Sequence, residues 1–283
     1  MMKVVVSVTL LRSEEKQIVE HLKKNSIEVD IMTEKNNDSL TNLKEYDLAI
    51  IRNLSQKTCL QRAKLFESLG VKCINSLDVI NIATDKLIQS NVFSSYNLPI
   101  PNYEVVFTET NYMDLFNRFN DTFIIKPINA SWGRGIVRIN NTEEFNLWKE
   151  TVSSLDLKKQ NFPYLAQEYI NKENYDVRIL VIGKKIEGIF KRVSMENWKT
   201  NTHLGAEVVP IKVTKEIKNI VDKILVCTND SILGIDLLFD IVKQRYVICE
   251  INNNPEFAKS SKIYGVDIGE KISKYIIKEL KND

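Results

Sequence analysis

The sequence predicts an α/β protein, and three observations support this prediction. Strand-like and helix-like segments alternate over the first 80 or so residues. Pro99 and Pro101 then interrupt the chain, because proline cannot continue a helix. From about residue 165 the pattern becomes mostly strand. The alternation favours a small parallel sheet covered by helices, and the strand-rich part favours a second unit built on another sheet.

The N-terminal segment holds the alternating elements. Its apolar runs predict strands at 4–8, 29–32, 47–53 and 71–75. We expect a helix over 13–24, with Ser13 as a candidate N-cap. A second helix is expected over 57–69, where Gly70 ends it.

The middle segment begins with a helix over about 85–96, which the two prolines end. Residues 122–139 predict a strand, a loop and a second strand. Asn141 and Glu144 have the spacing of a capping box, which predicts a helix that runs to about residue 155.

The C-terminal segment predicts five strands and two helices. The strands are expected at 165–170, 177–182, 186–193, 234–240 and 246–253. A turn at 183–185 joins the second and third of these strands as a hairpin. An amphipathic helix is expected over 214–228, and another begins near Ile268 and closes the chain.

The composition argues against several classes of protein. With 39 basic and 37 acidic residues, the net charge of +2 argues against a nucleic-acid binder. No apolar run approaches about 18 residues, so we expect no transmembrane helix and no membrane partner. The first residues are interpreted as a strand, not as a signal peptide. The four cysteines lack CxxC spacing, which is typical of reduced core residues in a cytoplasmic protein. Only two histidines are present, so a metal site would use oxygen ligands, which favour magnesium or manganese.

The sharpest chemical feature is a pair of apolar strands that carry oxygen-bearing side chains. Glu250 and Asn252 are two residues apart, so they share one face of a strand. If residues 241–245 turn the chain, Asp236 lies on the neighbouring strand and the three side chains converge on a magnesium site. Carboxylates among so many apolar residues need a charged partner. The alternative is that they are exposed polar positions on a half-solvated sheet.

A second feature is a glycine-containing loop that follows a strand. The chain has only nine glycines, and two of them, Gly133 and Gly135, lie shortly after Lys126. Glycines let backbone N–H groups approach a phosphate, and the lysine adds a positive charge. The loop lacks the Walker A pattern. The alternative is a simple hairpin turn with a solvated lysine.

Three further segments have weaker signals. Lys86 follows Asp85 at a helix start, where the helix dipole disfavours a cation, so a bound anion would explain it. The strand edge at 167–170 has backbone groups that can pair with an adenine ring. Arg192 precedes a polar and aromatic stretch and can clamp a carboxylate or a phosphoryl group. The alternatives are an exposed lysine, an ordinary strand and a solvated loop.

Taken together and in this order, these residues resemble the ATP-grasp superfamily. The resemblance is closest to the RimK-like carboxylate–amine ligases of the LysX/ArgX type, which act on an amino-group carrier protein. The strings that carry it are RNLSQ, INSLDVINIATDK, IIKPINASWGRG, QEYI, YDVRILVIG, RVSMENWKTNTHLG and EINNNPEF. The resemblance implies an ATP-grasp fold with an N-terminal parallel α/β domain, a central lid subdomain and a mainly antiparallel C-terminal subdomain. We expect these parts at residues 1–96, 97–165 and 166–283.

The resemblance also implies roles for residues of this chain, with ATP held between the central and C-terminal parts. The residues expected to line the ATP site are Lys86, Lys126, Ser131, Trp132, Gly133, Arg134, Gly135, Gln167, Glu168, Tyr169, Ile170, Asp176 and Arg178. The expected ligands of two Mg²⁺ ions, or of Mn²⁺, are Asp236, Glu250 and Asn252. The expected catalytic residues are Arg192 and Asn201. The expected substrate residues are Asn201, Thr202, Asn254, Glu256 and Phe257.

The activity that the resemblance implies is ATP-dependent joining of a carboxylate to an amine through an acyl phosphate. The protein's work in such a reaction is positioning and charge neutralisation. The expected substrates are glutamate or 2-aminoadipate and the C-terminal Glu of a small acidic carrier protein, in lysine- or arginine-type biosynthesis. The expected landing surface for this carrier consists of Lys191, Lys199, Lys259 and Lys262. We expect a homodimer or homotetramer in the cytoplasm.

Two segments depart from the family pattern. Residues Gly205 and Ala206 stand where relatives have two glycines, and 256–265 matches neither the aminoadipate-type nor the glutamate-type pattern. Two alternatives therefore stay open. One is a RimK-like ligase that adds amino acids to a free amino acid or a peptide tail, and the other is an ATP-binding protein without ligase activity.

Overall fold

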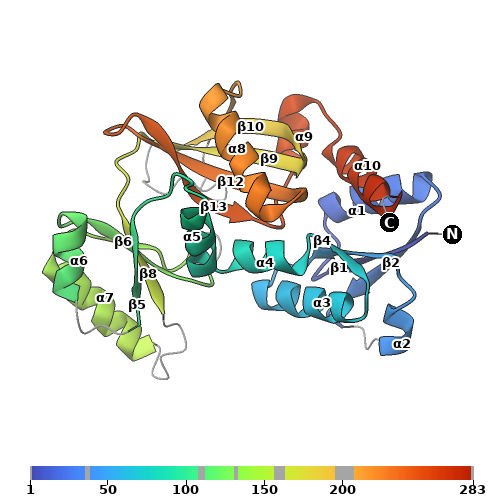
Figure 1. The fold of residues 1–283 in the computed structure, drawn as a ribbon, viewed down its shortest axis with the longest axis horizontal. Helices are drawn as coiled ribbons and strands as arrows, with labels where there is room; N and C mark the ends of the chain where they lie inside the picture. Colours follow the sequence, from blue (N-terminus) through green and yellow to red (C-terminus); the bar gives the residue numbers. More distant parts are fainter. Residues whose placement is uncertain are drawn as a thin grey trace.

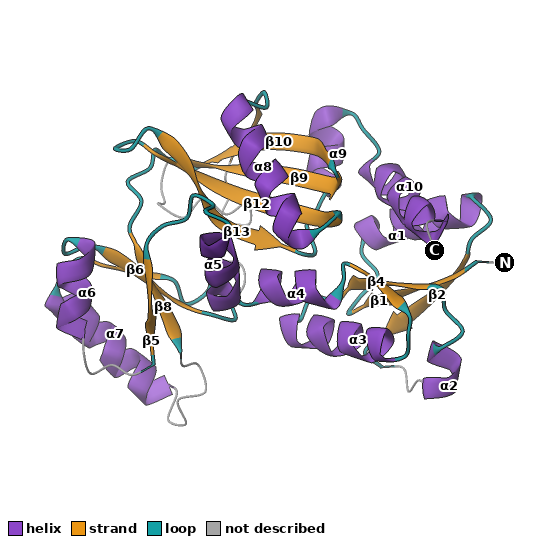
Figure 2. Cartoon of the chain, in the orientation of Figure 1, coloured by secondary structure: helices purple, strands orange, loops and turns teal. Residues whose placement is uncertain are grey.

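The computed structural model describes residues 2–35, 39–107, 112–130, 133–155, 163–194 and 207–281. Three sheets and their helices form an elongated molecule, with the N-terminal sheet at one end and the sheet built from residues 103–168 at the other (Figure 1). Each sheet is covered by helices (Figure 2). The predicted α/β class, with a parallel N-terminal sheet and a mainly antiparallel C-terminal sheet, is confirmed, and the central sheet is antiparallel as well. Within the described ranges, no helix combines the length and the apolar character needed to cross a membrane.

The N-terminal sheet is entirely parallel, with the strand order β2-β1-β3-β4. Its strands are β1 (Lys3–Val8), β2 (Glu28–Thr33), β3 (Leu48–Arg52) and β4 (Lys72–Ile74). The helices of this part are α1 (Ser13–Lys24), α2 (Leu40–Leu43), α3 (Gln56–Ser68) and α4 (Leu77–Thr84). The prediction of Ser13 as an N-cap is wrong, because Arg12 occupies that position. The Glu15 carboxylate reaches back to accept from the Arg12 N–H at 3.1 Å.

The valine run of β1 is buried on both faces, which is the pattern of a parallel strand between two helical layers. Val4, Val6 and Val8 join the core with α1 and α10 (Ile268–Lys281), and Val5 joins the core under α3. The last helix therefore packs beside the first one and brings the C-terminus next to the N-terminal sheet (Figure 1).

The helix α5 (Lys86–Ser95) leads from the N-terminal sheet to the central one. Asp85 caps it, because its Oδ1 accepts from the backbone N–H groups of Leu87 and Ile88 at 2.9 and 3.0 Å. Lys86 is thus the first helical residue, as the sequence predicts.

The central sheet is antiparallel, with the strand order β5-β8-β6-β7. Its strands are β5 (Tyr103–Val106), β6 (Phe123–Pro127), β7 (Val137–Ile139) and β8 (Tyr164–Glu168). Two helices, α6 (Tyr112–Phe119) and α7 (Thr142–Leu155), cover one face of it (Figure 1). An aromatic core joins them to the sheet, with the rings of Phe116 and Phe123 centred 5.2 Å apart and Phe145 beside them.

The C-terminal sheet has five strands in the order β11-β10-β9-β12-β13. They are β9 (Tyr175–Gly183), β10 (Lys185–Val193), β11 (Glu207–Pro210), β12 (Ser231–Asp240) and β13 (Arg245–Asn252). One face is apolar and packs on α8 (Lys215–Thr228), through Val177, Ile235 and Ile248 against Ile220 and Ile224. The opposite face is therefore the one that is free to carry polar side chains.

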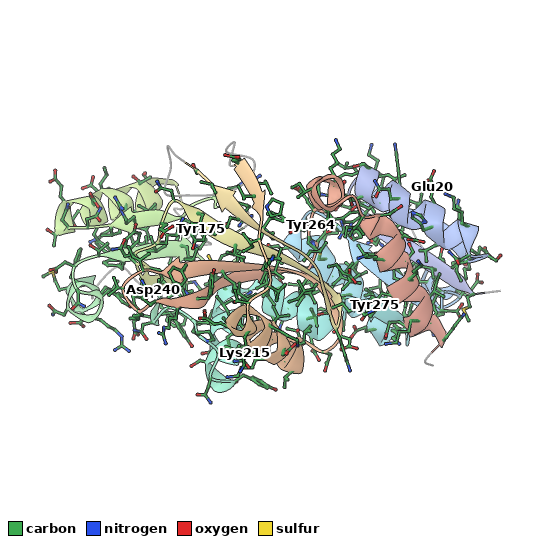
Figure 3. All side chains as sticks on the ribbon, turned by 90° about the horizontal axis from the view of Figure 1, so that it is seen from above. Glu20, Tyr175, Lys215, Asp240, Tyr264 and Tyr275 are labelled. Carbon is green, nitrogen blue, oxygen red and sulfur yellow. The ribbon has the colours of Figure 1, made fainter. Side chains whose placement is uncertain are left out.

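The C-terminal sheet also packs against the N-terminal part, through residues at one end of the face opposite α8. Leu180 and Ile232 enter the same core as Ile74. Tyr264 of α9 (Ala258–Tyr264) accepts from the Ile189 N–H at 2.8 Å, and Tyr275 donates to the Asp230 carbonyl at 2.7 Å. Both tyrosines lie where the sheet meets the N-terminal part in the view from above (Figure 3).

Candidate active site

The predicted carboxylate pair lies on the hairpin of β12 and β13. Asp236 and Glu250 are directly opposite each other. The register shifts immediately afterwards, since Leu237 pairs with Ile248 and Cys249 becomes the extra residue of a bulge. A bulge changes which face the next side chains occupy. Glu250 therefore shares the polar face with Asp236, whereas Ile248 lies with Leu237 in the apolar core on the other face.

Two arginines hold Asp236 on this face. The Nε atom of Arg178 lies 2.7 Å from Asp236 Oδ1, and a terminal nitrogen of Arg192 lies 3.0 Å from Oδ2. Arg192 also donates to both oxygens of Asp176, at 2.6 and 2.9 Å. Strand pairing brings these groups together, because Arg178 is opposite Asp236 and Arg192 is opposite Asp176. The structure thus brings four predicted site residues into contact in the order Arg178, Asp236, Arg192 and Asp176, so that positive and negative groups alternate.

The surroundings of Arg192 favour the charged form of its guanidinium group. The side chain is 4% exposed, and burial by itself lowers the pKa of a guanidinium. The negative charges of Asp236 and Asp176 outweigh burial and raise the pKa of Arg192 above its usual value. A permanently charged, doubly anchored guanidinium can stabilise negative charge that develops in front of it.

Two lysines approach Glu250 from the other side of the site. Lys86 Nζ lies 3.9 Å from Glu250 Oε2 and donates to the carbonyl of Ala130. Lys126, on β6, is 5% exposed, and burial together with the nearby charge of Lys86 lowers its pKa, while Cys249 and Glu250 act in the opposite direction. An anion that binds between the two ammonium groups would stabilise both charges.

The residues on the polar face fit a divalent cation. Asp236 Oδ1 is buried and accepts no aligned hydrogen bond from the described residues, although Arg178 is close to it. The Nδ2 atom of Asn252 is also buried without a partner in the part of the chain that the structure describes. In those same ranges no three His, Cys, Asp or Glu side chains gather as a metal site. A cation would therefore need the Asn252 amide oxygen beside the two carboxylates, a set of hard oxygen donors that suits magnesium.

The predicted glycine loop connects β6 and β7. Gly133 and Gly135 both have positive φ, 69° and 67°. A Cβ atom at Gly135 would lie 2.9 Å from Pro127 Cγ, so both the backbone conformation and the available space require glycine. Arg134 lies between them on the exposed turn. Ser131 and Trp132 lie outside the described residues, so phosphate binding by this loop stays a prediction.

The predicted adenine strand, β8, ends at Glu168. The Glu168 carboxylate accepts from the Asn102 side chain at 2.9 Å and pairs with Lys243 Nζ at 2.6 Å. It therefore ties β8 to the segment before β5 and to the turn between β12 and β13. Gln167 and Ile170 are buried, and the ring of Tyr169 lies 5.3 Å from the guanidinium carbon of Arg138. Adenine binding by this segment stays a prediction.

The predicted substrate residues are in different environments. Asn201 and Thr202 lie outside the described residues. Asn254 donates to the Asn53 carbonyl at 3.0 Å. Glu256 is exposed, 3.6 Å from Arg12, whereas Phe257 is fully buried in the core shared with the N-terminal sheet. Their substrate roles rest on the resemblance alone.

Sequence analysis missed the buried polar contact between the N-terminal and C-terminal parts. Arg52, 4% exposed, donates to Glu15 at 3.0 Å and to the Pro255 carbonyl at 3.3 Å. Burial raises the pKa of Glu15, but Arg12 and Arg52 outweigh this and lower it below its usual value. The signal in the sequence is the arginine at the end of a fully apolar strand, since a buried guanidinium needs a partner.

Two protein-family models together match most of the chain. The LysX preATP-grasp domain model matches residues 4–82, and the RimK-like ATP-grasp domain model matches residues 83–276. The alpha-aminoadipate–LysW ligase LysX of Sulfurisphaera tokodaii is 30% identical over 278 residues, which is 96% of this chain and 95% of the relative. The glutamate–LysW ligase ArgX of the same organism is 29% identical over 281 residues, 97% and 98% of the two chains.

The fold has a counterpart among solved structures as well. The RimK-domain ATP-grasp protein of Sphaerobacter thermophilus superposes with a TM-score of 0.77 at 15% identity and covers 97% of this chain and 99% of its own. With both parts of the chain matched and the charged face between its sheets in place, this chain belongs to the RimK-like ATP-grasp family of carboxylate–amine ligases.

Proposed function

We propose that this chain is an ATP-dependent ligase that joins the amine of glutamate or 2-aminoadipate to the C-terminal Glu carboxylate of a small acidic carrier protein. The observation that carries this proposal is the meeting of Lys86 and Lys126 with the charged face of Asp236, Glu250 and Arg192. The named activities of the two LysW ligases described above support the class of amino acid and the carrier.

The reaction couples two displacements. An oxygen of the substrate carboxylate attacks the γ-phosphorus of ATP, the bond from that phosphorus to the β–γ bridging oxygen breaks, and ADP leaves. The amine nitrogen then attacks the acyl carbon, the bond from that carbon to the phosphate oxygen breaks, and phosphate leaves while the nitrogen loses a proton. The products are ADP, phosphate and an amide. Because neither step needs a protein nucleophile, the protein contributes positioning and charge neutralisation.

Each of the described site residues contributes to this positioning and charge neutralisation. Lys86 and Lys126 bind phosphate oxygens, and the buried position of Lys126 makes its charge more effective than that of a solvated lysine. Arg192, which Asp176 and Asp236 hold on two sides, faces the transferring group without having to reorient. Asp236, Glu250 and Asn252 would hold Mg²⁺, which when bound neutralises phosphate charge.

Two lysines support an acidic carrier as the partner. Lys262 is exposed in the last turn of α9. Lys191 lies over the ring of Tyr175, with Nζ 3.7 Å from its centroid, so its ammonium group is held in place by a cation–π contact. Lys199 and the side chain of Lys259 are outside what the structure describes. Substitution of Lys262 by Glu is expected to raise KM for the carrier and to leave ATP binding unchanged.

The test incubates the purified protein with ATP, Mg²⁺, an acidic carrier that ends in Glu and either amino acid. The expected result is ADP release together with an increase in the carrier's mass by one amino-acid residue. ADP release with free amino acids or a peptide tail and without a carrier would support the broader RimK-like activity instead. Tight nucleotide binding with no ADP release under any of these conditions would overturn the proposal and favour a non-catalytic ATP-binding protein.

A further inference from the structure

A glycine lies on the polar face of the C-terminal sheet, two residues before Asp236. Gly234 is opposite Asn252 on β13 and opposite Leu180 on β9, in a strand that is mostly apolar and mostly buried. A glycine inside a strand has no side chain to pack and weakens it. Its φ lies outside the left-handed region, so the backbone conformation does not explain the residue.

Space explains it instead. A Cβ atom at Gly234 would lie 2.5 Å from Arg178 Nη1 and 3.1 Å from Pro255 Cβ. The first distance is too short for any real contact. The guanidinium of Arg178 therefore occupies the volume in which a side chain of residue 234 would begin, and this position places it against Asp236.

The two arginines on Asp236 are held to different degrees. Arg192 is 4% exposed and is anchored on both sides by Asp176 and Asp236. The side chain of Arg178 is 21% exposed, and among the described residues it forms an ion pair with Asp236 alone. That contact is close, but Asp236 Oδ1 accepts no aligned hydrogen bond there. Arg178 is thus the less firmly held of the two.

The excess of positive charge in the site favours the departure of Arg178 from Asp236 when a divalent cation binds this carboxylate. The cations Lys86, Lys126, Arg178 and Arg192 outnumber the carboxylates Asp176, Asp236 and Glu250. A divalent cation on Asp236 would lie close to the Arg178 guanidinium, and like charges repel strongly in a partly buried site.

We infer that Arg178 is an exchangeable counter-ion of Asp236, and that it fits beside this carboxylate because Gly234 has no side chain. When a divalent cation binds Asp236, the guanidinium leaves the carboxylate, moves within the space above Gly234 and pairs with the phosphoryl group of the reaction. The inference deepens the proposed function and rests on it for the identity of the anion. Through Arg178, binding of the metal then raises the affinity for the anion, and binding of the anion raises the affinity for the metal. Gly234 is a positioning residue that acts through Arg178.

The test measures Mn²⁺ binding by electron paramagnetic resonance in the presence of ADP, with and without inorganic phosphate. In the native chain, phosphate should tighten Mn²⁺ binding about tenfold, the size of a typical coupling between two ligands. Arg178→Met should bind Mn²⁺ more tightly than the native chain without phosphate, because the competing cation is gone, and should lose the effect of phosphate. Equal Mn²⁺ affinity in Arg178→Met and the native chain would overturn the inference.

A double-mutant cycle tests the role of Gly234. Gly234→Ala should displace Arg178 and reproduce the loss of the phosphate effect. In Arg178→Met the space is vacated, so the added methyl group should change Mn²⁺ affinity by less than about twofold and should cost less thermal stability than it does in the native chain. Additive effects of the two substitutions would overturn the role of Gly234. If Gly234→Ala alone does not fold, recovery of a folded protein in the double variant gives the same answer.

Gly188→Ala is the matched control. Gly188 lies on β10 of the same sheet, and its Cβ would lie 3.2 Å from the ring of Tyr264, away from Asp236. This variant should keep the native Mn²⁺ affinity and the native phosphate effect. A loss of the effect in Gly188→Ala would show that crowding anywhere in the sheet suffices, which overturns the inference. The phosphate and Mn²⁺ measurements need no carrier, so a wrong carrier would abolish ligation and leave them unchanged.

Discussion

Asp236 and Glu250 lie directly opposite each other on β12 and β13, and positively charged side chains lie beside both of them. Arg178 lies 2.7 Å from Asp236, and Lys86 lies 3.9 Å from Glu250. Two carboxylates placed side by side repel each other, and the paired cations offset that repulsion. The fold therefore brings a positively charged group to each carboxylate of the pair.

Glu250→Gln should abolish Mg²⁺-dependent turnover, because it removes a ligand charge and almost no volume. We expect kcat to fall by about 100-fold or more, with the melting temperature within about 3 °C of the native value. ADP release and thermal unfolding measure the two effects. Glu20→Gln, an exposed position on α1 (Figure 3), is the control and should behave as the native chain does. Normal turnover in Glu250→Gln would show that the metal assignment is wrong.

Lys126→Ala should weaken ATP binding and lower turnover together, since the buried ammonium group has no substitute on β6. A loss of about tenfold or more in ATP affinity is expected for a buried charge that contacts phosphate. Lys126→Met keeps the aliphatic stem and separates the loss of charge from the loss of packing. Isothermal titration with ATP measures both variants. If Lys126→Met binds ATP as tightly as the native chain, the ammonium group does not contact the phosphates.

Asp176→Asn should destabilise the fold, because it leaves the buried Arg192 with one carboxylate instead of two. The free energy of unfolding is expected to fall by about 1–3 kcal/mol, the cost of a charged hydrogen bond inside a protein. Asp222→Asn breaks an ion pair on the exposed face of α8, where Lys218 and Asp222 are 65% and 53% exposed, and should cost about 0–0.5 kcal/mol. Urea unfolding compares the two. Equal costs would mean that Asp176 does not anchor Arg192.

The four thiols should be unreactive at pH 8 in the folded protein. Burial raises the pKa of Cys59 and Cys227 to about 11 and that of Cys73 and Cys249 to about 12. Alkylation by iodoacetamide, followed by mass spectrometry, should be slow for the folded chain and fast in denaturant, because the thiolate is the reactive form.

These raised pKa values also give stability a pH dependence with a definite sign. Below the unfolded value of 9 both states keep the thiol protons, so stability does not change. Above pH 9 the unfolded chain loses protons that the folded chain retains, so stability should fall as the pH rises towards 11 and 12. Urea unfolding between pH 8 and pH 10.5 measures this. Constant stability across that range would contradict the burial of the thiols.

Several parts of the site could be predicted because they depend on neighbours along the chain. The helix start at Asp85 and Lys86, the glycine loop at 133 and 135, and the hairpin that pairs Asp236 with Glu250 are all local features. The bulge at Cys249 could not be predicted in this way. Strict alternation would place Glu250 and Ile248 on one face, and the extra residue separates them.

The sequence by itself determined the order and type of the main elements, because apolar periodicity, caps and turns act over a few residues, and it named the charged side chains that the structure brings together. Only the tertiary structure decided which charges meet. Arg178 reaches Asp236 through strand pairing, and Arg52 reaches the Pro255 carbonyl across 203 positions of sequence. The physical reason is that a buried charge needs a partner, and the fold can bring that partner from any part of the chain. The spacing of residues along the sequence does not show which partner this is.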